Sequence, residues 1–107
     1  MINVVNIKTH VKKAGETDIY IGRGSVLGNP FSHKTGTLAE VVCASREEAI
    51  EKYRSYFEEQ IKDADGKFIN ELRRIYVLSR QTDVNLMCFC YPLACHGNII
   101  KDFLSKF

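Results

Sequence analysis

The sequence predicts an α/β fold: a small layered domain with a short, mostly parallel sheet, helices packed on it and a Rossmann-like topology. Short segments rich in β-branched residues alternate with longer segments in which apolar residues recur at helical spacing. One of the short segments is apolar on both faces, as a central strand is. The long stretch between the second and third predicted strands is helical, which suits a parallel crossover.

Three segments are predicted as strands. Residues 2–7 (INVVNI) and 18–21 (DIYI) are short and β-branched. Residues 84–90 (VNLMCFC) are apolar on both faces, which predicts a central strand with helices on both sides. If the last two are parallel neighbours, the loops after them leave from the same edge of the sheet. That edge is where open α/β folds bind ligands.

Three helices follow from apolar spacing and from start and stop signals. Ser45 and Glu48 form a capping box before a helix over 46–62, and DADG at 63–66 ends it. A second apolar stripe predicts a helix from there to about residue 79, and a third predicts a helix over 98–107. Residues 32–44 fit either a short edge strand or a loop.

Length and composition predict a single soluble domain over residues 1–107. The chain is 45% hydrophobic and 26% charged, which is ordinary for a globular protein. Lys and Arg number 15 against 13 Asp and Glu, a balance too even to indicate nucleic acid as a partner. No apolar run approaches the roughly 18 residues of a membrane helix, so no membrane association is expected.

The cysteines indicate a reducing compartment. Three of the four crowd into eight residues, which is not the spacing of a disulfide framework. The first ten residues, MINVVNIKTH, have no basic start and no small-residue cleavage site, so we expect mature, cytoplasmic sequence. Cys43 and Cys88 are expected in the core, and His10 and His33 on the surface.

The first motif is the glycine-rich loop GRGSVLGNPF at residues 22–31. Its N–H groups can form a concavity for an anion, and Arg23 adds a guanidinium suited to phosphate. The expected ligand-binding residues here are Arg23, Gly24, Ser25, Gly28 and Asn29. The spacing matches neither the P-loop nor the dinucleotide fingerprint. The alternative is a structural turn in which Arg23 only forms an ion pair.

The second motif is CFCYPLACHG at residues 88–97, between the third strand and the last helix. Cys95 is a candidate nucleophile because a helix N-terminus favours the thiolate, and His96 is a candidate general acid or base because imidazole titrates near neutral pH. Cys90, Gly97 and Asn98 are candidate ligand contacts, with Gly97 allowing a phosphate close to the backbone. The alternative for these residues is structural.

Zinc is the metal that the cysteines and histidine of this motif could bind. The pattern C-x-C-x4-C-H offers four ligands, but the usual knuckle is C-x2-C with a second pair further away. Cys88 would also have to turn out of the core to reach a metal. We therefore expect no metal and no cofactor.

These motifs together resemble a known family. IYIGRGSVLGNPF, REEAIEKYRSYF and LMCFCYPLACHGNII are similar to DUF4326, a domain of unknown function found in bacteria and in many phages. The resemblance covers about residues 4–104. Its patterns GR-x-S-x-x-GNPF and C-x-C-x-P-x-x-CHG both occur here. Two positions depart: Phe89 stands where Trp is common, and Asn98 where Asp is common. Asn98 can replace a capping Asp but not a catalytic one.

The two motifs are compatible with three functions. The first is a domain that binds a phosphate-bearing small molecule, a nucleotide or nucleotide-derived signal, with Arg23 and His96 lining one cleft. The family's phage members make sequestering or degrading a host signalling nucleotide, in the host cytoplasm, an expectation. The second is a nucleotide-processing enzyme using His96 or Cys95, although neither motif holds a carboxylate to orient His96. The third is a protein-interaction or inhibitor domain. A homo-oligomer is left open.

Overall fold

A computed structural model describes residues 1–32, 41–42, 45–89 and 95–107 of the chain. Its elements are, in order, β1 (Ile2–Asn6), β2 (Glu16–Tyr20), β3 (Phe31–Ser32), β4 (Val41–Val42), α1 (Arg46–Gln60), α2 (Lys67–Ser79), β5 (Asp83–Cys88) and α3 (His96–Leu104). The three predicted strands and three predicted helices are all present. Their ends differ by a few residues from those that the pattern predicts.

The main sheet has the order β1-β5-β2, and both pairings are parallel. Leu86 in β5 is level with Val4 in β1 and with Ile19 in β2. The sequence-based prediction of a parallel crossover between β2 and β5 is therefore confirmed. β3 and β4 form a separate parallel pair, with Phe31 level with Val41.

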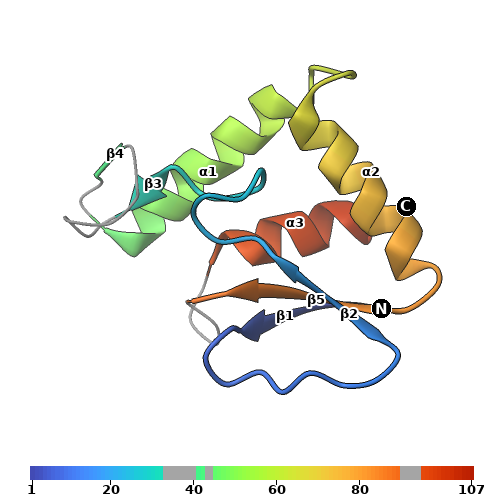
Figure 1. Cartoon of the computed structure of the whole chain (residues 1–107). Helices are drawn as coiled ribbons and strands as arrows, with labels where there is room; N and C mark the ends of the chain where they lie inside the picture. Colours follow the sequence, from blue (N-terminus) through green and yellow to red (C-terminus); the bar gives the residue numbers. More distant parts are fainter. Residues whose placement is uncertain (33–40, 43–44, 90–94) are drawn as a thin grey trace.

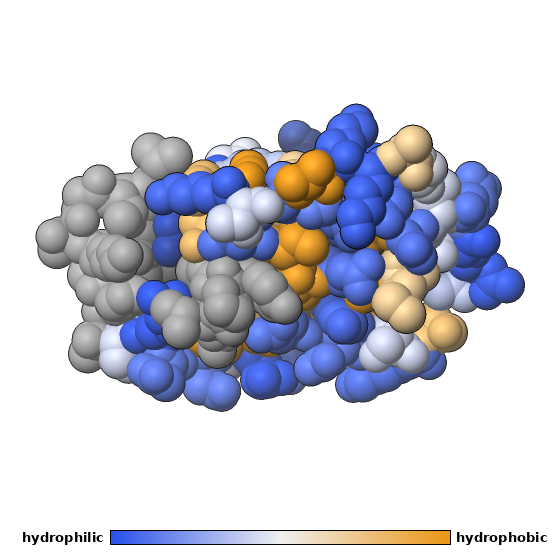
Figure 2. Space-filling model, turned by 90° about the horizontal axis from the view of Figure 1, so that it is seen from below, coloured by the Kyte–Doolittle hydropathy of each residue, from blue (hydrophilic) through white to orange (hydrophobic). Residues whose placement is uncertain are grey.

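The helices lie on one face of the sheet, and the connection 7–15 runs along the other (Figure 1). Val84, Leu86 and Cys88 of β5 are buried, whereas Met87 is half-buried and Phe89 is exposed. The expectation of helices on both sides of this strand is therefore wrong. The connection after β1 forms no helix, and among the described residues it is this polar segment that approaches the second face. Hydrophobic side chains gather in the middle of that face, with hydrophilic ones around them (Figure 2).

The core lies between the sheet and the helices. Apolar side chains from β2 and β5 meet the stripes that were predicted on the helices, including Phe57, Leu72 and Ile100. Phe57 packs edge-on against Phe68 and Phe103, with ring centroids 5.3 and 5.1 Å apart. Cys88 is part of this cluster, as expected. Among the described residues, no helix is long and apolar enough to cross a bilayer.

Local signals explain where the helices start. The hydroxyl of Ser45 accepts a hydrogen bond from the N–H of Glu48 at 3.1 Å, which confirms the predicted cap of α1. The carboxylate of Glu48 forms an ion pair with Lys52 at 3.3 Å. Helix α3 starts at His96, two residues before the predicted start, and ends at Leu104. This earlier start brings His96 into the helix and against the core.

Candidate functional site

The two sequence motifs meet at the carboxyl edge of the sheet. Ile21, directly after β2, donates its N–H to the carbonyl of Met87 in β5 at 3.1 Å. The carbonyl of Ile21 lies 2.5 Å from Nε2 of His96 at the start of α3. The glycine-rich loop and the Cys/His segment therefore leave neighbouring strands and touch, as the order of elements predicted.

His96 is buried at this junction. Its side chain is 7% exposed, and its ring stands edge-on to that of Tyr53 with centroids 5.0 Å apart. Burial lowers the pKa of His96 to about 4; the hydrogen bond to the Ile21 carbonyl opposes the shift, and the charge of Arg23 adds to it. At neutral pH the ring is uncharged, and its Nε2–H donates to Ile21. This arrangement favours an anchoring role for His96, and the acid–base role stays a prediction.

Arg23 is close enough to His96 to influence its protonation. Its side chain is half-buried, and its guanidinium donates a hydrogen bond to the carbonyl of Asn29 across the loop. The buried amide of Asn29 donates in turn to the carbonyl of Ala49 in α1 at 3.4 Å. Arg23 thus closes its own loop and places a positive charge beside the start of α3.

The remaining polar groups of the loop contact the loop itself. Ser25 donates its hydroxyl to the carbonyl of Gly22 at 2.6 Å, and Gly28 donates its N–H to the carbonyl of Ser25 at 3.0 Å. Gly24 has a φ of +89°, a conformation that favours glycine, and it is exposed at the tip of the loop. Hydrogen bonds within the loop therefore preorganise its shape, and they leave Gly24 and Val26 exposed.

Tyr53 of α1 fixes this loop from beneath. Its hydroxyl is fully buried and donates to the carbonyl of Leu27 at 2.8 Å. Burial raises the pKa of Tyr53 far above its usual value, so the proton stays on the hydroxyl. Because the same ring touches His96, one residue of α1 contacts both motifs.

The second motif is packed as tightly as the first. Cys95 is the residue that caps α3, and its Sγ lies 3.2 Å from Sγ of Cys88. A Cβ on Gly97 would lie 2.9 Å from the side chain of Ile21 and 3.1 Å from that of Val4, so glycine lets α3 approach the sheet. Asn98 is exposed. Cys43, Cys90 and His33 lie outside the described residues.

A polar cluster on the open face of the sheet was not predicted from the sequence. Nε2 of His10 lies 3.0 Å from Oδ1 of Asp18, and both side chains are largely buried. The amide of Asn85 donates to Asp18 at 3.0 Å and to Glu16 at 2.9 Å. The hydrogen bond from Asn85, and after it that with His10, lower the pKa of Asp18. The expectation that His10 is an isolated surface residue is wrong, because the 7–15 connection folds back over the sheet.

A pair of exposed aromatic side chains was also not predicted from the sequence. Tyr20 and Phe89 are 36% and 55% exposed, and their rings meet edge-on with centroids 6.3 Å apart. The hydroxyl of Tyr20 donates to the carbonyl of Arg23 at 3.0 Å, and Nζ of Lys8 lies 5.9 Å from the centre of the Phe89 ring. Side chains alternate between the two faces along β2 and β5, so the rings of Tyr20 and Phe89 lie on one face of the sheet. This alternation was the sequence signal from which the pair could have been predicted.

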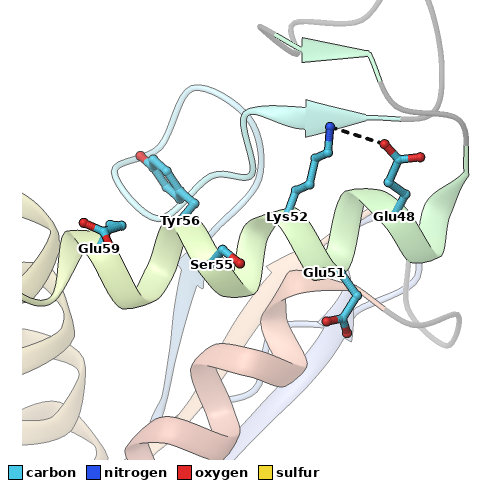
Figure 3. A pocket seen from close by; sticks show the side chains of 6 residues that line it. All are labelled: Glu48, Glu51, Lys52, Ser55, Tyr56 and Glu59. Carbon is cyan, nitrogen blue, oxygen red and sulfur yellow. Dashed lines mark ion pairs between the residues drawn. The ribbon is translucent and has the colours of Figure 1, made fainter.

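A hollow along α1 lies apart from these motifs (Figure 3). It is open and lined by Glu48, Glu51, Lys52, Ser55, Tyr56 and Glu59. Glu48 and Lys52 point toward one another and form the ion pair described above (Figure 3). Three carboxylates make the hollow unfavourable for an anion, and it holds none of the predicted site residues. In the described part of the chain, no three His, Cys, Asp or Glu side chains gather as metal ligands.

Comparison with known protein families gives a match over most of the chain. The model of the family described as a domain of unknown function (DUF4326) matches residues 5–106. No curated protein and no solved structure matches the chain significantly. The resemblance to this family is therefore confirmed over nearly the whole chain.

Proposed function

We propose that this chain, which belongs to the DUF4326 family, binds a nucleotide or nucleotide-derived signal at the carboxyl edge of its sheet. The observation that carries the proposal is the exposed aromatic pair Tyr20 and Phe89, which is joined to the Arg23 loop by a hydrogen bond. A heterocyclic base and a phosphate are the two chemistries that aromatic rings and a guanidinium recognise together.

Three features support a phosphate at this edge. Arg23 provides a half-buried positive charge held in position by its own loop. The exposed tip at Gly24 lets an anion approach the backbone. Helix α3 starts beside them, and helix N-termini favour negative charge. Because His96 is uncharged at neutral pH, the ligand's phosphate would meet the charge of Arg23 here and not that of an imidazolium.

The aromatic pair supports a base rather than a bare anion. Phe89 is more than half exposed although its neighbours in β5 are largely buried. Stacking a base on such a ring contributes roughly 1–3 kcal/mol. Lys8 beside the ring adds positive charge on the same face.

The geometry supports binding more than turnover. His96 is anchored to a carbonyl and buried, and the carboxylates of Glu16 and Asp18 bond to Asn85 on the opposite face of the sheet. Side chains alternate between the two faces along β2, so the carboxylates of Glu16 and Asp18 lie on the face away from the helices, whereas His96 lies on the helix side. Binding without turnover fits sequestration of a signalling nucleotide.

The test is calorimetric titration of the purified chain with nucleoside monophosphates, diphosphates and cyclic nucleotides, beside inorganic phosphate and bare nucleosides. We expect Arg23→Ala to weaken nucleotide binding at least tenfold, and Arg54→Ala, an exposed arginine of α1, to leave it unchanged. Phe89→Ala is expected to weaken nucleotide binding but not phosphate binding. Phe107→Ala, at another exposed ring, is the matched control.

Two results would contradict the proposal. One is a panel in which no nucleotide binds more tightly than inorganic phosphate. The other is equal affinity of the Arg23 and Arg54 variants. Mass spectrometry of the titrated mixtures separates the alternatives, because an altered nucleotide would indicate the enzyme that uses His96 or Cys95.

A second candidate is a protein-interaction domain. The exposed apolar side chains on the open face of the sheet favour it (Figure 2). It predicts that Phe89→Ala abolishes binding to a protein partner whereas Arg23→Ala does not.

A further inference from the structure

We propose that Cys88 and Cys95 form a redox-active dithiol, which a peroxide closes to an intramolecular disulfide. This inference does not depend on the proposed nucleotide site. It rests on the juxtaposition of two sulfur atoms that the fold brings together from the end of β5 and the cap of α3.

The two thiols already touch. Their Sγ atoms are 3.2 Å apart, and a disulfide needs an approach to about 2.05 Å. Both side chains are buried, Cys88 at 1% and Cys95 at 3% exposure, so neither has to leave the core for the bond to form. Bringing the two Sγ atoms to bonding distance requires only a small movement within one packed cluster.

The fold holds the pair in place from both sides. Cys88 ends the central strand, with its side chain on the helix face beside Leu86 and Val84. Cys95 is held by α3, whose glycine at position 97 packs directly on Ile21 and Val4. The bond would therefore join two rigid elements at a site they already share.

The chemistry balances with one peroxide molecule. Cys95 gives up its proton and attacks a peroxide oxygen, so that the O–O bond breaks and Cys95 becomes a sulfenic acid. The hydroxide released takes up that proton and leaves as water. Cys88 then attacks that sulfur, and a second water leaves as the disulfide forms. Two thiols are oxidised and one peroxide is reduced to two waters.

The experiment uses the full chain and a Cys90→Ser variant. Trypsin releases residues 81–101 as one peptide that holds Cys88, Cys90 and Cys95, so the variant leaves only the proposed pair in it. The folded protein is treated with hydrogen peroxide, quenched with catalase, unfolded, alkylated and digested. We expect a peptide that carries no alkyl group and is lighter by two hydrogen atoms, and dithiothreitol should restore both alkylation sites.

Matched controls carry Cys88→Ser or Cys95→Ser in addition to Cys90→Ser, and neither can form the bridge. Far-ultraviolet circular dichroism checks that each variant is folded. If Cys90→Ser does not fold, fragmentation of the oxidised wild-type peptide locates the bridge directly.

Three outcomes would overturn the inference. The first is a folded variant in which both thiols remain open to alkylation after peroxide treatment. The second is a bridge to Cys90 or between two chains. The third is oxidation that proceeds only after a chelator is added, which would identify the pair as ligands of a metal.

Discussion

Protonation of His96 works against the fold, because the charged ring would lie among apolar side chains beside Arg23. The same residue that the sequence marks as a candidate acid or base is one of the contacts that close the loop over the sheet. At the scale of a single residue, the protein uses a histidine as a neutral hydrogen-bond donor. The physical reason is the cost of burying a charge without a partner of opposite sign.

This arrangement predicts a pH-dependent stability. The folded pKa of about 4 lies below the ordinary value of 6.5, so between these values the unfolded chain binds a proton that the folded chain does not. The free energy of unfolding should therefore fall as the pH drops from about 6.5 to about 4, by at most about 3 kcal/mol. Urea unfolding at several pH values measures it.

The comparison variant is His96→Gln, whose amide keeps a donor but has no group that titrates in this range. The difference in stability between wild type and variant should shrink as the pH falls. A parallel loss in both proteins would show that groups other than His96 cause the pH dependence.

At the scale of elements, the connection 7–15 does the work that a crossover helix does in larger α/β sheets. It returns the chain from the end of β1 to the start of β2 along the face that the helices leave open (Figure 1). The contact of His10 with Asp18 ties it to β2, and Asn85 of β5 supports Asp18. These side-chain contacts thus hold the connection over part of the open face.

We expect His10→Ala to loosen this connection without unfolding the sheet. Loss of one partly buried hydrogen bond is worth about 1 kcal/mol, which corresponds to about fivefold faster cleavage by trypsin after Lys12 and Lys13. Val11→Ala, at an exposed neighbour, is the control. Equal cleavage rates in the two variants would mean that His10 does not hold the connection.

At the scale of the whole molecule, the site depends on how closely α3 lies on the sheet. Gly97 sets that distance, because any Cβ there would lie within contact range of Ile21, Val4 and Cys95. Closeness of the helix start brings together the two motifs and the two sulfur atoms. The same packing therefore underlies both proposals.

Gly97→Ala should destabilise the folded protein by about 1–3 kcal/mol through overpacking. Ile21→Val removes the methyl group nearest the new Cβ, so the double variant should lose less stability than the two single losses added together. Asn98→Ala, at an exposed position, should change stability by no more than about 0.5 kcal/mol. Chemical denaturation measures all four proteins.

A different result would restore the role that the sequence suggested for Gly97. If Gly97→Ala is as stable as wild type but binds nucleotide more weakly, the glycine serves the approach of the ligand. The outcome separates packing from recognition at one position.

Most of the fold was predictable from local pattern. The helical stripes, the cap at Ser45 and the apolar β5 were identified, because each depends on residues a few positions apart. The meeting of the two motifs was predictable too, since parallel neighbours end at one edge. The candidate site was predictable only as a location. The burial of His96 depends on Tyr53, which lies 43 positions earlier in the chain.

The sequence by itself determined the three helices, the three strands of the main sheet and their mostly parallel arrangement, together with the family and the edge at which the motifs meet. Only the tertiary structure decided that His96 is a buried donor, that His10 pairs with Asp18, that Tyr20 joins Phe89 and that two cysteines touch. The physical reason is range: periodicity and capping are read within a turn or a strand. The surroundings of a polar or aromatic side chain depend on the path of the chain through space.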